Sequence, residues 1–256
     1  MIGELLLKSR YIRYPINKML FRAFNHHRKL KVFRNKHLGE TILIVGNGPS
    51  LNNTPLDKFK IPSIGMNKIN LIYDRTTWRP SYILCNNGLV MNQNREYFKT
   101  TSIPVVLDYK AAFLNIRASN IRYFLPHFKD TFSEDFDENV GVSGTVTYTA
   151  LQYAYYLGVK RILIVGVDHN FKGYTNDKIS SKIETFKGED ENHFDPNYFK
   201  GMKWGVPDMA RSEIGYRRAS EFLTKRNIEI YDATVNGKLN IFPKISIDEA
   251  TEMIGS

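Results

Sequence analysis

Two short apolar segments, each followed directly by a polar turn that contains glycine, constrain the fold of this 256-residue chain most strongly. Residues 41–45 have the sequence Thr-Ile-Leu-Ile-Val and end at Gly46-Asn-Gly-Pro-Ser50, and residues 161–165 have the sequence Arg-Ile-Leu-Ile-Val and end at Gly166-Val-Asp168. Continuous β-branched runs are typical of strands buried on both faces of a parallel sheet. The chain is therefore predicted to be an α/β protein with a doubly wound, Rossmann-like sheet.

Further elements are expected around these two strands. Three more parallel strands are predicted at residues 63–66, 81–85 and 103–107, and two helices at residues 143–157 and 214–225. Ser143 is expected to be the N-cap of the first of these helices. Near the end of the chain, strands at residues 228–231 and 239–242 are predicted to form a hairpin across Asn236-Gly237. Residues 170–210 are polar, aromatic and weakly periodic, which indicates a lid or acceptor-binding loop.

Polar residues follow the predicted strands at the points where ligands of doubly wound sheets bind. Besides the turn at 46–50, these are Asn67, Asn86 and Asp168. The pair Gly46 and Gly48 lacks the third glycine of the dinucleotide fingerprint, and no Gly-Lys-Ser/Thr sequence completes a Walker loop. A plain tight turn and a phosphate site remain open as alternatives for this turn. Asn47 and Ser50 favour a ligand site, because both can hydrogen-bond a ligand without adding charge.

Candidates for chemistry are few. His193, with Asp195 nearby in a long polar loop, could be a base, although a surface histidine is the commoner outcome. His169 lies next to Asp168 at a strand end and is a second candidate. Asp135-x-Asp137 has the spacing of a metal-binding pair, but its surroundings favour a solvated loop. The single cysteine excludes a disulfide framework and a thiolate zinc cluster, so the reducing cytoplasm is the expected compartment.

The positive charge of the chain is concentrated at its N-terminus. Residues 1–38 hold ten Lys and Arg against one acid, Glu4, so this arm carries +9 of the total +10. A basic surface restricted to an arm argues against a nucleic-acid-binding body. Apolar residues follow Pro15 at helical spacing, and these are Ile16, Met19, Leu20, Ala23 and Phe24. Such a basic amphipathic helix fits an anionic membrane surface, and the alternatives are docking on its own domain or on a second subunit; RNA binding is less favoured.

The motifs between residues 41 and about 245 resemble, taken in order, the bacterial lipooligosaccharide sialyltransferases of glycosyltransferase family 42. The series is Ile44-Val-Gly-Asn-Gly-Pro-Ser-Leu51, Asn67, Asn86, Val142-Ser-Gly144 and Gly158-Val-Lys-Arg-Ile-Leu-Ile-Val-Gly-Val-Asp168. It is also similar to the related group that includes motility accessory factors, which glycosylate flagellin with nonulosonic acids, and archaeal MptE-like pterin pyrophosphokinases. The tail from Ile230 to Pro243 looks more like this broader group.

This resemblance implies one Rossmann-like domain of GT-A-variant type over residues 39–256, which binds a CMP-sugar donor without a metal or a resident cofactor. The donor-binding set that it implies is Gly46, Asn47, Gly48, Ser50, Asn67, Asn86, Ser143, Gly144 and Asn170. Within this set, Asn47 and Ser50 are expected at the donor phosphate and ribose. Ser143 and Gly144 are expected at the sugar carboxylate or at a phosphate.

The catalytic set implied by the resemblance is His193, Asp168 and Tyr174, and two positions depart from the family pattern. The tyrosine that stabilises the leaving phosphate in the family is replaced by Asn170, so that Tyr174 is the available substitute. The catalytic histidine of the family falls on Asn197 when the histidine four positions earlier is placed on His193. Either His193 is the base, or the chemistry differs.

The leading hypothesis is a metal-independent glycosyltransferase that moves a nonulosonic acid from a CMP donor to a surface glycan or glycolipid. One alternative is an MptE-like, ATP-dependent pterin diphosphokinase, which would need Mg²⁺ and an acidic pair such as Asp168 with Asp135 or Asp137. Another is a non-catalytic nucleotide-binding scaffold in glycan assembly. The expected location is the cytoplasm, peripheral on the inner membrane face through residues 1–38, and homo-oligomer formation is left open.

Overall fold

A seven-stranded, fully parallel sheet forms the centre of the computed structural model, which describes residues 10–127, 129–172 and 183–255. The strand order is β11-β8-β1-β2-β3-β4-β5. The strands are β1 (Thr41–Val45), β2 (Ser63–Met66), β3 (Tyr82–Cys85), β4 (Val105–Asp108), β5 (Ile121–Phe124), β8 (Arg161–Val165) and β11 (Glu229–Asp232). The central strands are buried on both faces, as their apolar sequences predict. The doubly wound, Rossmann-like α/β fold is therefore confirmed.

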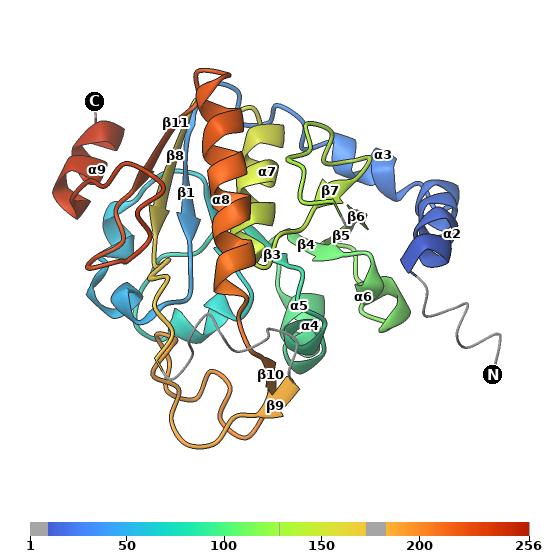
Figure 1. Ribbon diagram of the computed structural model, residues 1–256, viewed down its shortest axis with the longest axis horizontal. Coiled ribbons are helices and arrows are strands. Elements are labelled where there is room, and N and C mark those ends of the chain that lie inside the picture. The colour runs from blue at the N-terminus through green and yellow to red at the C-terminus, as the bar shows by residue number, and fades with distance from the viewer. Residues whose placement is uncertain (1–9, 128, 173–182, 256) are drawn as a thin grey trace.

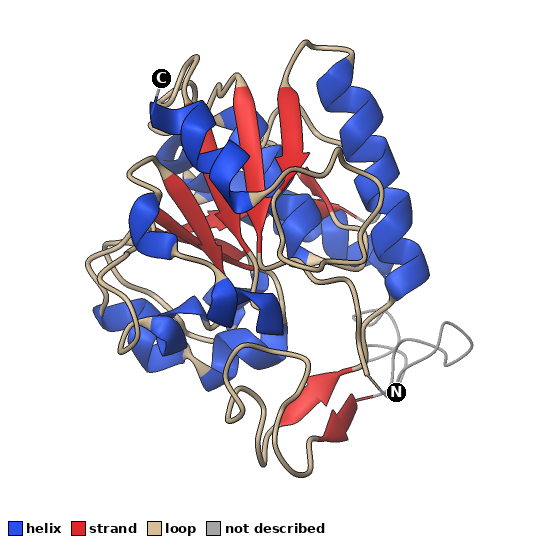
Figure 2. Ribbon diagram, turned by 90° about the vertical axis from the view of Figure 1, so that its left-hand side faces the viewer, coloured by secondary structure: helices blue, strands red, loops and turns tan. Residues whose placement is uncertain are grey.

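Helices cover both faces of the sheet (Figures 1 and 2). They are α2 (Arg10–Ala23), α3 (His26–Lys31), α4 (Gly88–Gln93), α5 (Arg95–Thr100), α6 (Lys110–Phe113), α7 (Val146–Tyr156), α8 (Met209–Thr224) and α9 (Ile247–Gly255), with 3₁₀ turns η1 (Pro49–Asn53), η2 (Leu56–Lys58) and η3 (Ile69–Ile72). Helix α7 packs across β1, β2 and β3, and α8 packs against α7 and β11. Helix α7 is buried on most sides, since its tyrosines fill the core between the sheet and α8.

The topology creates a crevice between β1 and β8. From β1 the chain adds strands in one direction as far as β5, and it then returns to place β8 on the other side of β1. Ligands of doubly wound sheets bind at such a switch point, beyond the carboxyl ends of the strands. The turns that follow β1 and β8 approach closely here, because a Cβ at Gly46 would lie 2.1 Å from the Gly166 carbonyl oxygen.

The polar loop after β8 contains a small hairpin. Strands β9 (Ile183–Thr185) and β10 (Lys203–Gly205) pair antiparallel, and both views place them beyond the carboxyl ends of the sheet strands (Figures 1 and 2). A second small sheet joins β6 (Pro126–His127) to β7 (Val140–Gly141).

Two predictions of local structure are wrong. Ser143 is not the N-cap of α7: Gly144 has a φ of +69°, which turns the chain, and the side chain of Thr145 accepts from the Thr147 amide instead. The hairpin near the end of the chain does not form. Residues 239–242 are irregular, and β11 pairs parallel with β8 because the sheet offers it an open edge there.

The part of the N-terminal arm that the structure describes packs on the body. Phe21, Leu30 and Phe33 are buried in the main core, and α3 lies against β5. The guanidinium of Arg34 bonds to Asp135 and Asp137, both at 2.7 Å. Among the helices described, none is long and apolar enough to span a membrane.

The pair Asp135 and Asp137 lies far from the end of β8. Asp135 lines a surface pocket together with Gly158 and Ile228, which precede β8 and β11, so it lies at the amino edge of the sheet. Asp168 follows β8 at the opposite, carboxyl edge, one strand length away, which is roughly 17 Å for five residues. The acidic pair expected for a Mg²⁺-dependent mechanism, Asp168 with Asp135 or Asp137, is therefore not assembled.

Candidate functional site

A cavity of about 310 Å³ opens at the switch point. Its walls come from the turns after β1, β2, β3 and β8, from the N-terminus of α7, and from the loop that contains β9 and β10. Of the residues predicted from the sequence, those that line it are Gly46, Asn47, Gly48, Asn67, Asn86, Gly144, Asp168, His169, Asn170 and His193. The fold thus brings together residues that are up to 147 positions apart in the sequence, from Gly46 to His193.

The carboxylate of Asp168 holds the turn after β1. It accepts hydrogen bonds from the Ser50 amide at 3.0 Å and from the Ser50 hydroxyl at 2.7 Å. A Cβ at Gly48 would lie 1.8 Å from its Oδ2, so any larger residue at this position would displace the carboxylate. Burial raises the pKa of Asp168, and the hydrogen bonds from Ser50 act in the opposite direction. Ser50 is itself buried beneath the turn rather than on the cavity wall.

Neutral amides form one wall of the cavity. Asn47 donates to the Met66 carbonyl at 3.0 Å, while its buried Oδ1 has no protein partner. Asn67 has a φ of +53° at the end of β2, and its Oδ1 is likewise buried without a partner. Asn86 donates to Thr149, and Asn87 caps α4. Two buried amide oxygens without a hydrogen-bond partner lower the stability of the folded protein, unless a ligand in the cavity donates to them.

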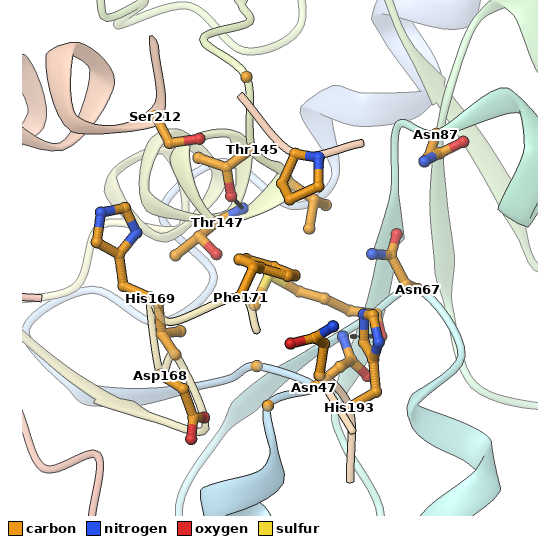
Figure 3. Close-up of a pocket in the computed structure, with 18 of the residues that line it drawn as sticks. Asn47, Asn67, Asn87, Thr145, Thr147, Asp168, His169, Phe171, His193 and Ser212 are labelled. Carbon is orange, nitrogen blue, oxygen red and sulfur yellow. Dashed lines mark hydrogen bonds between the residues drawn. The ribbon is translucent and has the colours of Figure 1, made fainter. Parts of the chain in front are cut away.

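The N-terminus of α7 forms the opposite wall. Gly144, Thr145 and Thr147 line the cavity there, and Figure 3 shows the two threonines on the side away from Asn67 and His193. The free amides of a helix N-terminus favour an anion. Ser143 does not take part, because it is fully buried and its hydroxyl donates to the Arg211 carbonyl at 2.8 Å.

His193 is held by a buried carboxylate. Its Nδ1 lies 2.9 Å from Oδ2 of Asp190, whose side chain is fully buried. The imidazole stacks on Tyr198 with ring centroids 4.1 Å apart and meets Phe199 edge-on. Because a carboxylate accepts, Nδ1 carries the proton and Nε2 is the basic nitrogen. The acid beside His193 is therefore Asp190 and not Asp195, which pairs with Arg75 at 2.7 Å.

The loop around His193 is fastened to the turns after β1 and β2. The Phe194 amide donates to the Asn47 carbonyl at 3.0 Å, and the Phe194 carbonyl accepts from Asn52 and Arg75. The ammonium of Lys68 donates to the Tyr198 carbonyl at 2.7 Å. These bonds fix the position of His193 relative to the cavity.

The remaining predicted residues have different placements. His169 has a φ of +50° and lies on the opposite side of the cavity from His193, with Nε2 3.2 Å from Glu213 (Figure 3). Asn170 lines the cavity and is exposed. Asn197 is exposed and does not line it. Tyr174 lies outside the described residues.

Several lining residues were not anticipated. The aromatic ones are Phe171, Phe199, Trp204 and Tyr216, and the polar ones are Asn87, Thr145, Thr147, Asn192 and Ser212. Only Thr145 had a local signal, because threonine is a common N-cap residue, whose hydroxyl accepts from an amide two or three residues later. Within the described residues, no group of three or more His, Cys, Asp and Glu is arranged to hold a metal ion. Asp168 is the one carboxylate among the lining residues described.

Two kinds of similarity to known proteins are found, one to a family model and one to a solved structure. A model of the family described as 6-hydroxymethylpterin diphosphokinase MptE-like matches residues 18–174. Among solved structures, the sialyltransferase CstII from Campylobacter jejuni in complex with a substrate analogue, cytidine-5'-monophosphate, is similar with a TM-score of 0.39 and 15% identity, over 82% of this chain and 86% of that one. No curated protein matches in sequence.

Proposed function

The chain belongs to the MptE-like family. On the geometry of the site, we propose that it is a glycosyltransferase, which moves a sugar from a nucleotide-linked donor to a hydroxyl of a glycan or glycolipid. The observation that carries the proposal is His193, buttressed by the buried Asp190, at the wall of a cavity lined by neutral amides and a helix N-terminus. That combination suits the removal of a proton from an alcohol next to an anionic leaving group.

His193 is the general base in this proposal. Asp190 fixes the imidazole so that Nε2 is the acceptor, and it stabilises the imidazolium that forms when the acceptor hydroxyl loses its proton. The bond between the anomeric carbon and the phosphate oxygen breaks as the acceptor oxygen attacks. The donor's nucleotide leaves as a phosphate anion.

In this proposal the leaving phosphate binds at the N-terminus of α7, because the amides of Gly46 and Gly48 already donate to the carbonyls of Val165 and Gly166. Helix α7 has eleven residues, so its N-terminus offers unpaired amides and a positive partial charge. The orphaned Oδ1 atoms of Asn47 and Asn67 accept from hydroxyl or amino groups of the nucleotide or sugar. Asp168 shapes the turn through Ser50 and is a positioning residue.

A CMP-linked nonulosonic acid is the donor that we favour, because the motif series resembles that of enzymes using such donors. The carboxylate of such a sugar would bind at Thr145 and Thr147, where neutral donors and the helix N-terminus compensate its charge. Turnover is proposed not to depend on added Mg²⁺, because the described lining residues supply one carboxylate and each of its oxygens accepts a hydrogen bond from Ser50.

The family description favours a second candidate, diphosphate transfer from ATP to the hydroxymethyl group of a pterin. His193 would again accept the proton of the alcohol, and Asp168, the one carboxylate among the described lining residues, would hold the Mg²⁺ that neutralises the phosphates. The two candidates therefore share a base but differ in nucleotide and in metal requirement.

Binding and donor cleavage together separate these candidates. Thermal unfolding is measured with CMP, CDP, UDP, GDP and ATP, each with and without Mg²⁺. A ligand at 100 times its dissociation constant stabilises the folded state by about 2.7 kcal/mol. Release of CMP from CMP-N-acetylneuraminic acid is then followed for the unmodified protein, His193→Gln and the control His127→Gln, a histidine that does not line the cavity.

We expect CMP to stabilise the folded protein without Mg²⁺. We also expect His193→Gln to lower the rate of donor cleavage by about 10²–10⁴-fold while CMP binding is retained. His127→Gln should behave like the unmodified protein. Stabilisation by ATP and Mg²⁺ alone would replace the proposal with the diphosphokinase. Nucleotide binding with no cleavage or transfer in any variant would indicate a non-catalytic scaffold.

A further inference from the structure

One face of α2 is apolar and points into solvent. The sequence predicts an apolar stripe on this helix, and the body packs against the other side, where Phe21 is buried. On the outer side, Ile16 is 44%, Met19 62% and Phe24 61% exposed. Ile16 and Met19 on α2, and Phe24 directly after its end, are therefore largely uncovered, although exposing three large apolar side chains close together is unfavourable in water.

Helix α6 extends this face. Phe113, at the end of α6, is 58% exposed. A chain of ring contacts joins it to Phe24: Phe24 meets His26 at 6.2 Å, His26 meets Tyr109 at 5.4 Å, and Tyr109 meets Phe113 at 5.3 Å. Figure 1 shows α2 and α6 at the same end of the molecule. Ile16, Met19, Phe24 and Phe113 are called the α2–α6 face below.

The surroundings of this face are basic. Lys18, Arg28 and Lys29 belong to the same arm, and none of them forms an ion pair with a described carboxylate. Burial, followed by the charges of Lys29 and Arg117, lowers the pKa of His26 to about 4, so both bases lie near the ring contacts of the face. Exposed apolar side chains in an arm whose cations form no ion pair with the described carboxylates are typical of a helix that lies on an anionic bilayer.

We propose that the α2–α6 face binds the surface of a membrane that contains anionic lipid, with Met19, Phe24 and Phe113 inserted among the headgroups. A second copy of the chain is a poorer occupant, because it would bring two sets of unpaired bases together. Surface binding of this kind needs no turnover, so the inference stands apart from the proposed function.

The test uses the full chain, because Phe21, Leu30 and Phe33 are core residues and removal of residues 1–38 would open the core. Sedimentation with phosphatidylcholine vesicles is compared with sedimentation with vesicles that also contain about 30% phosphatidylglycerol, which gives the membrane a strong negative surface charge. The variants are Met19→Gln/Phe24→Gln/Phe113→Gln and Arg28→Gln/Lys29→Gln. The matched control is Ile214→Gln, on α8, where an apolar side chain is 46% exposed.

The unmodified protein should sediment with the anionic vesicles and lose binding as salt is raised. The triple variant should bind on the order of a hundredfold more weakly, and the charge variant about fivefold more weakly for each base removed. Ile214→Gln should bind as the unmodified protein does. No binding by the folded, unmodified protein, or equal binding by the triple variant, would overturn the proposal. Dimerisation that the triple variant abolishes, without vesicle binding, would assign the face to a second copy.

Discussion

Lys68 makes the stability of this protein depend on pH in an unusual range. The residue directly follows Asn67, and only 4% of its surface is exposed. Its ammonium donates to the Tyr198 carbonyl and lies 4.7 Å from the centre of the Phe199 ring. Burial lowers the pKa of Lys68 to about 8, while the charge of Asp190 acts in the opposite direction. Lys68 therefore fastens the loop that holds His193 at a cost in desolvation.

The size of this effect follows from proton linkage. In the unfolded chain the pKa of a lysine is about 10.4, so between about pH 8 and pH 10.4 the unfolded state binds more protons than the folded state. The free energy of unfolding then rises with pH by about 1.4 kcal/mol per unit, or about 3 kcal/mol across the window. This stabilisation is fully present above the unfolded pKa and is lost as the pH falls through the folded pKa.

Urea unfolding of the unmodified protein and of Lys68→Met, measured at intervals from pH 7.5 to 10.5, tests this reasoning. Other titrating groups are common to both proteins, so the difference between their free energies of unfolding isolates Lys68. That difference should move by about 3 kcal/mol in favour of the unmodified protein as the pH rises. Lys200→Met, which removes an exposed lysine of the same loop, is the control. The difference in free energy of unfolding between the unmodified protein and Lys200→Met should not change with pH. Parallel pH profiles for the unmodified protein and Lys68→Met would refute the reasoning.

Three further predictions concern the site and the core. Gly48→Ala should fold but bind nucleotide about tenfold more weakly in calorimetry, because its Cβ displaces the Asp168 carboxylate from Ser50. Asn87→Ala should lower the free energy of unfolding by about 1 kcal/mol, since Asn87 caps α4 through the Leu89 and Val90 amides. Leu163→Ala, at a fully buried position of β8, should lower it by about 2–5 kcal/mol in urea unfolding. In each case, an unchanged midpoint or affinity would contradict the assigned contact.

The central strands could be predicted from the sequence, because burial on both faces imposes an unbroken apolar run. β1 and β8 have such runs and lie where they were expected. The hairpin predicted near the end of the chain is wrong, because its formation depends on contacts between distant residues. Residues 239–242 are mostly apolar, as in a strand, but the chain meets β11 at Lys244, where one parallel bridge and a hydrogen bond from the Lys244 ammonium join it to Asp232. Whether such a segment pairs with its neighbour or lies beside the sheet depends on long-range contacts, and local pattern does not contain them.

The site could be predicted where the fold itself places residues, and not where a loop does. Asn47, Asn67, Asn86 and Asp168 each follow a strand, so the parallel sheet brings them to one edge whatever the loops do. The partner of His193 could not be found in this way. Asp190 and Asp195 lie three residues before it and two after it, and both positions are compatible with contact in an irregular loop. Arg75, remote in sequence, decides between them: it binds Asp195 and the Phe194 carbonyl, which turns Asp195 away and leaves the buried Asp190 to the imidazole. The chemistry of the loop therefore depends on two cations that follow β2 in the sequence, Lys68 and Arg75, as much as on its own residues.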